Sequence, residues 1–462
     1  MNIRYRLEEK KTAGLWCLLA CVLAVVFSGC VCHAPDNFFY VPGLLPRTTL
    51  QMKTAGFWIA RHPQPDGVVL TAREIDRFNQ RVRDELSLTK DLSLWPSLTP
   101  GEELRLGLQT QLEDLKGRGL VWLNGQKPSA AYWSSVDVAV NRDAVPEEIP
   151  RQYGLVVRYA SQRFLPVEEG LYAKAYDADF DELQNSALDI GTPVVILRHS
   201  PDGKWLYVES AFSAGWLRAE NVAQVTDEMM ERVWLEPLAV ITAPKADIYL
   251  NEAMTDFYGF VLMGTRLPLV EARGDYFEVL IPFRQTDGTA RFEPGFIPAA
   301  DVHEGYLPYT PRNILTQAFK MLNQPYGWGG MYGEQDCSRF LQEVFSTVGI
   351  ELPRDSKNQI KTGEAIALWE KETAGEEKLR FLQEQAVGGI TLLGMKGHIM
   401  LYLGQVEGRA YAVHAVWAYR RPSRGQDEIV VLNRVAVTDL TLGEGSRKGS
   451  LLKRLNAVRS VR

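Results

Sequence analysis

Cysteine is scarce in this chain and is confined almost entirely to its start. Of 462 residues only five are cysteines, at positions 17, 21, 30, 32 and 337. A disulfide framework is therefore excluded for the body of the protein, because Cys337 has no partner thiol there. A single thiol in such a body is either an inert buried residue or a nucleophile, and its surroundings decide between the two.

A surplus of positive charge is also missing. The 51 Lys and Arg residues are outnumbered by 57 Asp and Glu residues, which gives a formal net charge of -6. A nucleic-acid partner needs a concentrated basic surface to neutralise phosphates, and the sequence contains no such run. With 46% hydrophobic and 23% charged residues, the composition is that of a soluble globular protein. The length predicts three or four domains.

Residues 1–30 differ in character from the rest and are predicted to be a signal peptide. Basic residues precede a short apolar run at 14–27, which suits a signal-peptide core and is short for a transmembrane helix. The following F-S-G-C resembles the lipobox of bacterial lipoproteins, although Phe27 stands where Leu, Val or Ile is preferred. We therefore expect lipidation at Cys30 and an exported, membrane-anchored protein facing the periplasm or cell envelope. Cleavage near Ala34 and an uncleaved anchor are the alternatives.

The next part, residues 31–150, is predicted to be an N-terminal helical or wrapping domain. Residues 72–86 have apolar positions Ile75, Phe78 and Val82 on one helical face. This part contains no motif that points to chemistry. A packing role is therefore the simplest expectation.

Short alternating strands with turn residues follow. Residues 194–208 contain two apolar runs around Pro-Asp-Gly, which predicts a hairpin, and a Gly-Trp strand comes next. A similar order recurs over residues 273–298, ending in a Gly-Phe strand. This order resembles bacterial SH3-like barrels, so two are expected, at 151–232 and 233–308. Two small antiparallel barrels of another kind are the alternative.

Cys337 is predicted to lie in the first turn of a helix. Asp336 suits the N-cap position, and Phe340, Leu341 and Val344 begin an apolar stripe. The unpaired N–H groups and the dipole at a helix start favour a thiolate, so we expect a lowered pKa and an oxyanion hole. This position favours a chemical role over that of a buried structural cysteine.

Two of the six histidines lie on a predicted β-hairpin, with strands at 398–403 and 411–417. If the hairpin is symmetric about Val406, His398 faces His414 with Cβ atoms about 5 Å apart. One imidazole then accepts the thiol proton and the other orients it. A structural role at a sheet end is the simpler reading of either histidine alone. Zinc bound by Cys337 and the two histidines is another alternative, but no HxxxH or CxxC spacing adds a ligand.

The ordered motifs resemble the NlpC-type cell-wall peptidases, a papain-like superfamily. They are P-Y-G-W-G-G, D-C-S, L-P-R-D-S, G-H-I-M-L-Y-L-G and V-H-A-V, within about residues 310–435. The resemblance implies a multidomain α+β protein. Its catalytic domain (309–462), with helices packed on an antiparallel sheet, would follow the helical segment and the two SH3-like barrels. Such tandem barrels are similar to those of γ-D-glutamyl-L-diamino acid endopeptidases.

The resemblance also implies the roles of individual residues in a cysteine peptidase. Cys337 would be the nucleophile, His398 the general base and His414 the orienting third member. The pocket for the free L-Ala amine of a peptidoglycan stem peptide would be shaped by Asp336, Ser338, Asp355 and Ser356, and Tyr326 would lie near the oxyanion. The bond cleaved would join the γ-carboxyl of D-Glu to a diamino acid, without a metal or organic cofactor.

Several points remain open in this interpretation. Helix capping is an alternative role for Asp355 and Ser356, and Tyr207 and Glu209 are candidates to reach the cleft from the first barrel. Arg339 replaces the glycine that usually follows D-C-S, and residues 362–385 look like a charged helical insertion that could overhang the cleft. An amidase or acyl-transfer enzyme on the same frame is a rival function. A non-catalytic wall-binding lipoprotein is the other.

Overall fold

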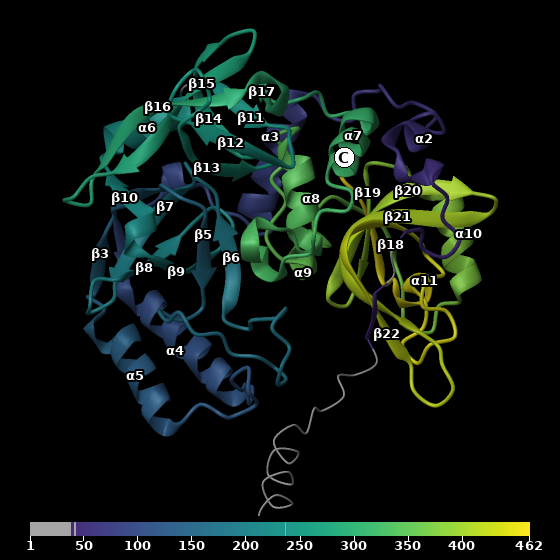
Figure 1. The fold of residues 1–462 in the computed structure, drawn as a ribbon, viewed down its shortest axis with the longest axis horizontal. Coiled ribbons are helices and arrows are strands. Elements are labelled where there is room, and N and C mark those ends of the chain that lie inside the picture. The colour runs from purple at the N-terminus through teal and green to yellow at the C-terminus, as the bar shows by residue number, and fades with distance from the viewer. Residues whose placement is uncertain (1–37, 41–42, 236) are drawn as a thin grey trace, which may run out of the picture.

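The computed structural model describes residues 38–40, 43–235 and 237–462. It contains three seven-stranded sheets and one two-stranded sheet. Helix α8 (Cys337–Ser346) lies in the middle of the molecule, between the first two large sheets and the third (Figure 1). The predicted signal peptide and the lipidation site at Cys30 lie outside the described residues. No helix in the described ranges is long and apolar enough to cross a bilayer.

The described residues before 151 contribute to several hydrophobic cores, of which two receive most of them. Trp58 and Phe78 pack into the core that contains α8, whereas Leu108 and Val136 pack against Trp216 of the first large sheet. The elements are β1 (Phe38–Tyr40), η1 (Gln51–Lys53), α2 (Ala55–Ile59), α3 (Ala72–Gln80), η2 (Arg81–Glu85), η3 (Leu92–Leu94), β2 (Leu98–Pro100), α4 (Gly101–Gly117), α5 (Ala130–Val140), η4 (Arg142–Ala144) and β3 (Glu148–Pro150).

The first large sheet has the strand order β10-β4-β7-β8-β9-β5-β6. The predicted hairpin is confirmed, since Val195 pairs with Glu209 and His199 with Leu206. Its turn is held by the Asp202 carboxylate, which accepts the Lys204 N–H at 3.1 Å. The elements are β4 (Tyr153–Val156), β5 (Ala160–Arg163), β6 (Gln184–Leu188), β7 (Pro193–His199), β8 (Trp205–Glu209), β9 (Ala214–Arg218), η5 (Ala219–Asn221), β10 (Val222–Val225) and α6 (Asp227–Leu235).

The second large sheet has the order β13-β12-β16-β15-β14-β11-β17. Ile248, Val279 and Ile297 are fully buried at its centre. The predicted strands around residues 276–298 are observed as an antiparallel pair, in which Tyr276 is opposite Pro298. The elements are β11 (Leu238–Ile241), β12 (Lys245–Tyr249), β13 (Phe257–Leu262), β14 (Arg266–Ala272), β15 (Tyr276–Arg284), β16 (Ala290–Pro298), η6 (Ala299–Asp301) and β17 (Val302–Glu304).

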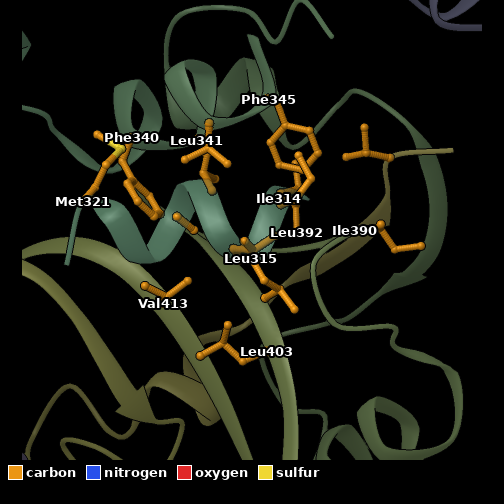
Figure 2. Packing of buried hydrophobic residues seen from close by; sticks show 14 of the residues in the cluster. Ile314, Leu315, Met321, Phe340, Leu341, Phe345, Ile390, Leu392, Leu403 and Val413 are labelled. Atoms are coloured by element: carbon orange, nitrogen blue, oxygen red, sulfur yellow. The ribbon is translucent and has the colours of Figure 1, made fainter. Parts of the chain in front are cut away.

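The third large sheet is covered by helices on both faces. Ile399 and Leu401 pack towards α7 and α8, whereas Met400 and Tyr402 pack towards Leu382 of α10, as the alternation of a strand requires. Figure 2 shows apolar side chains between α7, α8 and the sheet. The elements are α7 (Pro311–Lys320), η7 (Trp328–Gly333), α8, α9 (Ser356–Gln359), β18 (Glu364–Leu368), α10 (Gly375–Gln385), β19 (Thr391–Met395), β20 (His398–Val406), β21 (Arg409–Arg421), β22 (Glu428–Asp439), α11 (Leu451–Arg454) and β23 (Ala457–Ser460).

Residues 362–385 do not overhang the start of α8, so that expectation is wrong. The segment forms β18 at the edge of the sheet and α10 on the face opposite α8. Leu382 is fully buried there against Met400 and Tyr402. The apolar residues of this charged segment therefore anchor it to the back of the sheet.

The predicted register of the histidine hairpin is also wrong. Val406 pairs with Arg409, so the chain turns over Glu407 and Gly408, which both have positive φ. Such two-residue turns match the twist of a hairpin better than the five-residue connection that symmetry about Val406 requires. After an irregularity at 402–404, Leu401 pairs with Val413. The histidines are thus diagonal neighbours, offset by two residues, and share one face.

Candidate active site

The start of α8 is built as the sequence predicts, with Cys337 as its first residue and Asp336 as its N-cap. The Asp336 carboxylate accepts the N–H groups of Ser338 at 3.0 Å and Arg339 at 2.9 Å. Cys337 is buried and is the only free cysteine in the part of the chain that the structure describes. The cap therefore holds the first turn of α8 in place, and with it the buried thiol of Cys337.

His398 and His414 are in direct contact despite their diagonal register. The distance from His398 Nε2 to His414 Nδ1 is 2.6 Å, and His414 Nε2 lies 2.9 Å from the Thr438 hydroxyl. If His398 donates from Nε2 and His414 donates from its own Nε2, every contact has one donor and one acceptor. This arrangement leaves His398 Nδ1 as a base and holds His414 in one tautomer.

The thiol and His398 are linked through the start of β20. The backbone N–H of Ile399, the residue directly after His398, lies close enough to the Cys337 sulfur to lower the pKa of the thiol. Ile399 is fully buried in the same hydrophobic cluster as Cys337. The start of α8 and the start of β20 therefore meet at the thiol, and the three predicted residues belong to one site.

Burial governs the protonation of this site. Burial, together with the Asp336 carboxylate, raises the pKa of the Cys337 thiol to about 12, and the nearby Ile399 N–H opposes the rise. Burial, together with the charge of Arg454, lowers the pKa of His398 to about 4. The pKa of His414 is also lowered well below its usual value by burial. The expectation of a lowered thiol pKa is therefore wrong, because desolvation outweighs the helix start.

Arg354 is a member of the site that the sequence reasoning missed, although it lies within L-P-R-D-S. Its guanidinium is buried and contacts both Asp336 and Ser338, and it bonds Ser186 Oγ at 3.2 Å. Burial alone would raise the pKa of Asp336, but Arg354 outweighs it and holds that pKa below its usual value. Asp336 and Ser338 therefore shape the site as part of a buried network around the guanidinium.

The other predicted pocket residues lie around this network. Tyr326 is half-buried, and burial raises its pKa well above the usual value, with the nearby Cys337 and Asp336 adding to the effect. Asp355 is exposed, with a positive φ of 81°, and Ser356 begins α9. The Asp355 side chain makes no capping hydrogen bond to α9, so it is not held by the capping role considered as its alternative.

Tyr207 and Glu209 have contacts away from the thiol. Tyr207 packs edge-on against Trp216, with ring centroids 5.4 Å apart, and Glu209 forms an ion pair with Lys90 at 2.9 Å. These contacts hold both side chains at other partners, and the expectation that they reach the cleft stays a prediction. The first sheet approaches the site through β6 and the loop before it.

The glycines of the W-G-G motif allow this close approach. Gly329 and Gly330 both have positive φ, and a Cβ on Gly329 would lie 2.7 Å from the Gln184 side chain. Gln184 Nε2 donates to the Gly329 carbonyl at 3.1 Å, and the Tyr159 hydroxyl donates to the Gly330 carbonyl at 2.6 Å. The loop before Cys337 is therefore docked on the first sheet by its own backbone.

Arg339, which replaces the expected glycine, joins α8 to the same sheet. Its guanidinium is buried, pairs with Asp189 at 2.7 Å and Glu343 at 2.6 Å, and donates to the Ala187 carbonyl. Burial raises the pKa of Glu343 to about 8, although Arg339 opposes the rise. The substitution thus provides a buried charged contact between the site helix and β6.

An aromatic group closes another side of the site. Phe180, in the loop before β6, lies edge-on to Trp328 and Trp417 with ring centroids 5.3 Å and 5.0 Å away, and it also faces Tyr326. Asp179 accepts the Trp417 indole N–H at 2.8 Å. The loop from the first sheet therefore meets β21 directly beside Tyr326. In the ranges that the structure describes, no three His, Cys, Asp or Glu residues are arranged to hold a metal ion.

Comparison with known proteins identifies the parts of this arrangement. Residues 323–415 match the NlpC/P60 family, and residues 171–218 match an SH3 domain of the SH3b1 type. The chain therefore joins an NlpC/P60 domain, which contains Cys337, His398 and His414, to an SH3 domain that packs against it. The predicted resemblance is confirmed at this level. The domain boundaries remain predictions.

Individual relatives agree with this assignment. A solved structure described as a novel NlpC/P60 endopeptidase from Photobacterium damselae subsp. piscicida covers 92% of this chain and 99% of its own, with a TM-score of 0.75 and 21% identity, so it supports the fold. Proteins from Bacillus cereus and Bacillus subtilis, both named gamma-D-glutamyl-L-lysine dipeptidyl-peptidase, are 30% and 26% identical over 37% and 41% of this chain. The chain spans about half of their length, 48% and 57% respectively.

Proposed function

We propose that the protein is a cysteine peptidase that cleaves peptidoglycan stem peptides between the γ-carboxyl of D-Glu and the following diamino acid. The observation that carries the proposal is the buried thiol at the start of α8 beside a linked pair of imidazoles. The names of the two Bacillus relatives support the same bond. Retention of every side chain that the reaction needs argues against a non-catalytic wall-binding protein.

The reaction begins from a neutral thiol and a neutral imidazole. As the Cys337 sulfur attacks the γ-carbonyl carbon, its proton passes to His398 Nδ1, and His414 accepts the hydrogen bond from the opposite ring nitrogen. Thr438 holds His414 in the tautomer that can do this. Because His414 stays neutral, it orients the imidazolium of His398 without adding a counter-charge.

The oxyanion and the leaving amine are handled by neighbouring groups. The N–H groups of Ser338 and Arg339 are occupied by Asp336, so the Cys337 N–H and the Tyr326 hydroxyl are the proposed oxyanion donors. His398 then protonates the leaving nitrogen, and a thioester links the L-Ala-D-Glu part to Cys337. Water activated by His398 releases this dipeptide and restores the thiol.

The acyl side of the substrate is proposed to end at a free L-Ala amine. Asp355 and Ser356, beside the Arg354 network, supply the carboxylate and hydroxyl that a desolvated ammonium group needs. The loop that carries Phe180 packs against Tyr326 and limits the space beyond. Short peptides with a free amino end fit this arrangement better than intact glycan-linked peptides.

Product analysis tests the proposal. L-Ala-γ-D-Glu-L-Lys and its diaminopimelate counterpart should each yield the dipeptide L-Ala-D-Glu and the free diamino acid, identified by mass spectrometry. The same peptides with an acetylated L-Ala amine are the matched control and should be cleaved at least tenfold more slowly, since charged hydrogen bonds are lost. Release of whole peptides from glycan, with the γ-glutamyl bond intact, would identify an amidase instead.

The pH dependence of kcat/KM gives a second prediction. His398 must be neutral to accept the proton, and burial lowers its pKa to about 4, so activity should persist on acidification and fall with a midpoint near pH 4. Burial lowers the pKa of both imidazoles below the value in the unfolded chain. Their contribution to the free energy of unfolding is therefore fully present above about pH 6.5 and is lost progressively as the pH falls towards 4. Protein held at each pH and then assayed at pH 7 separates unfolding from titration. A reversible acid limb at pH 6.5 would contradict the proposed base.

The remaining parts of the chain are proposed to serve the cell envelope. We infer that Cys30 is lipidated after export, which rests on the lipobox-like F-S-G-C, and that the protein faces the periplasm or cell envelope. The seven strands β11 to β17 are proposed to be a second SH3-like barrel, because their hairpin and Gly-Phe strand repeat the order of the first.

A further inference from the structure

Four basic side chains, of which Arg454 is the one that acts on His398, lack an anionic partner. Arg420 lies on β21, Lys448 precedes α11, Arg454 ends α11, and Lys174 lies in the SH3 domain. Within the described ranges, none of these four side chains forms an ion pair or a hydrogen bond. In a chain with a net charge of -6, such a group is unexpected. We call these residues the basic cluster.

Backbone contacts bring Arg420 and Lys448 together. A Cβ on Gly443 would lie 3.2 Å from the Gly449 carbonyl oxygen and 3.5 Å from that of Arg420. The loop from 443 to 450, which contains Lys448, therefore lies against the end of β21. Trp417, three residues before Arg420, is held by Asp179 at 2.8 Å, which brings the SH3 loop to the same strand.

Arg454 lies on the side of the cluster nearest His398. Two residues after it, the Asn456 N–H donates to the Gly394 carbonyl at 3.0 Å. Gly394 precedes Met395, which pairs directly with His398 across β19 and β20. The charge of Arg454 is close enough to lower the pKa of His398. The cluster thus begins with Arg454, whose charge acts on the base, and continues to Arg420 on β21.

Lys448 and Arg454 are destabilised by burial and by the charges around them. Burial lowers the pKa of Lys448, and Arg420, Arg454 and Lys174 lower it further. Burial, followed by the charge of Arg420, lowers the pKa of Arg454 in the same way. Arg420 and Arg454 are half-buried, and a half-buried cation without a partner costs free energy that an anionic ligand would offset.

We propose that the basic cluster binds the carboxylate of the amino acid or peptide that leaves during cleavage. This inference rests on the proposed function and adds a subsite to it. His398 protonates the leaving nitrogen, and a leaving diamino acid carries its carboxylate one carbon from that nitrogen. The ammonium group of the acyl side belongs with Asp355 and Ser356, and the cluster would repel it. Arginine pairs with carboxylates through two parallel hydrogen bonds, which suits this role.

Three synthetic substrates test the subsite at pH 7. They are L-Ala-γ-D-Glu-L-Lys, the same peptide with a C-terminal amide, and L-Ala-γ-D-Glu-aminomethylcoumarin, which has no carboxylate on the leaving side. The wild-type protein should cleave the free acid with kcat/KM at least tenfold above the amide. In the double variant R420Q/K448Q the ratio of kcat/KM for the acid to kcat/KM for the amide should fall towards one, because only cleavage of the acid becomes slower. The amide and coumarin rates should stay within twofold of the wild-type rates. R424Q removes an exposed arginine from the adjoining segment and is the matched control.

The outcomes separate the two proposals. Equal rates for acid and amide in the wild type, or an unchanged preference in R420Q/K448Q, would overturn the subsite while the cleavage reaction stands. Failure of the wild type to cleave any of the three substrates would overturn the proposed function and the subsite with it. If R420Q/K448Q unfolds, charge reversal at the exposed Lys448 (K448E) replaces it, and the acid should then be cleaved more slowly than in the wild type.

Discussion

The Cys337→Ser variant should lose roughly 10⁴-fold or more in kcat, because a hydroxyl is a far weaker nucleophile when its base is a buried imidazole with a pKa of about 4. The measurement is turnover of L-Ala-γ-D-Glu-L-Lys. Folding should be little affected, since a hydroxyl is close in size to the thiol that it replaces and can also accept from the nearby Ile399 N–H.

A double variant makes this prediction sharper. Substitutions of residues that act as one catalytic unit do not have additive effects on kcat. The C337S/H398A variant should therefore be at most a few-fold slower than the slower of the two single variants. Unfolding in urea, followed by circular dichroism, checks that each variant is folded. If C337S keeps more than about a hundredth of the wild-type rate, the nucleophile lies elsewhere.

The Arg339→Met variant should be destabilised by about 3–5 kcal/mol, because it leaves the buried acidic side chains of Asp189 and Glu343 without their cation. Arg339 is the partner of both Asp189 and Glu343, and all three are largely buried between α8 and the first large sheet. Methionine fills much of the same volume, so the loss should come from charge rather than from a cavity. The measurement is the free energy of unfolding from urea titration at pH 7.

The matched control removes the stranded charges as well. R339M/D189N/E343Q should recover most of the lost stability, since replacing a whole buried ion network by neutral groups is often close to neutral. D189N/E343Q alone, which leaves the guanidinium without a carboxylate, should again be destabilised. Similar unfolding free energies for R339M and the triple variant would indicate that Arg339 acts through packing rather than through its charge.

Local chemistry explains how much of the candidate site could be predicted from sequence. An N-cap, a thiol and an apolar helix stripe are neighbours in the chain, so Asp336 and Cys337 were placed correctly. The pairing of His398 with His414 was predicted, yet through a wrong register, because the turn residues Glu407 and Gly408 decide the register and were read as part of a longer loop.

Long-range contacts explain what was missed. Thr438 lies on the strand after His414, and a threonine in a strand has no distinguishing signal. The basic cluster is drawn from residues 174, 420, 448 and 454, so no run of positive charge could be seen in the sequence. The sign of the thiol pKa shift was missed for the same reason, since burial of Cys337 depends on the whole molecule.

For the fold, too, local features could be predicted from the sequence and long-range contacts could not. Hairpins with Asp-Gly turns were predictable because their strands are adjacent in sequence, as for β7 and β8. The division of the residues before 151 among separate cores was not predictable, since it depends on which sheets residues such as Trp58 and Leu108 meet. Arg339 was noticed as a departure from the expected glycine, but its partner Asp189 lies 150 residues away.

Strand β1 has a consequence for where the protein works. Phe38 to Tyr40 run parallel to β22 and form the outer strand of the sheet that carries both histidines. If Cys30 bears the proposed lipid, only eight peptide steps separate the bilayer surface from that strand, a reach of at most about 29 Å. A tether this short would keep the enzyme at the membrane face. Small fragments diffusing there would meet it, whereas the outer layers of a thick wall would stay beyond its range.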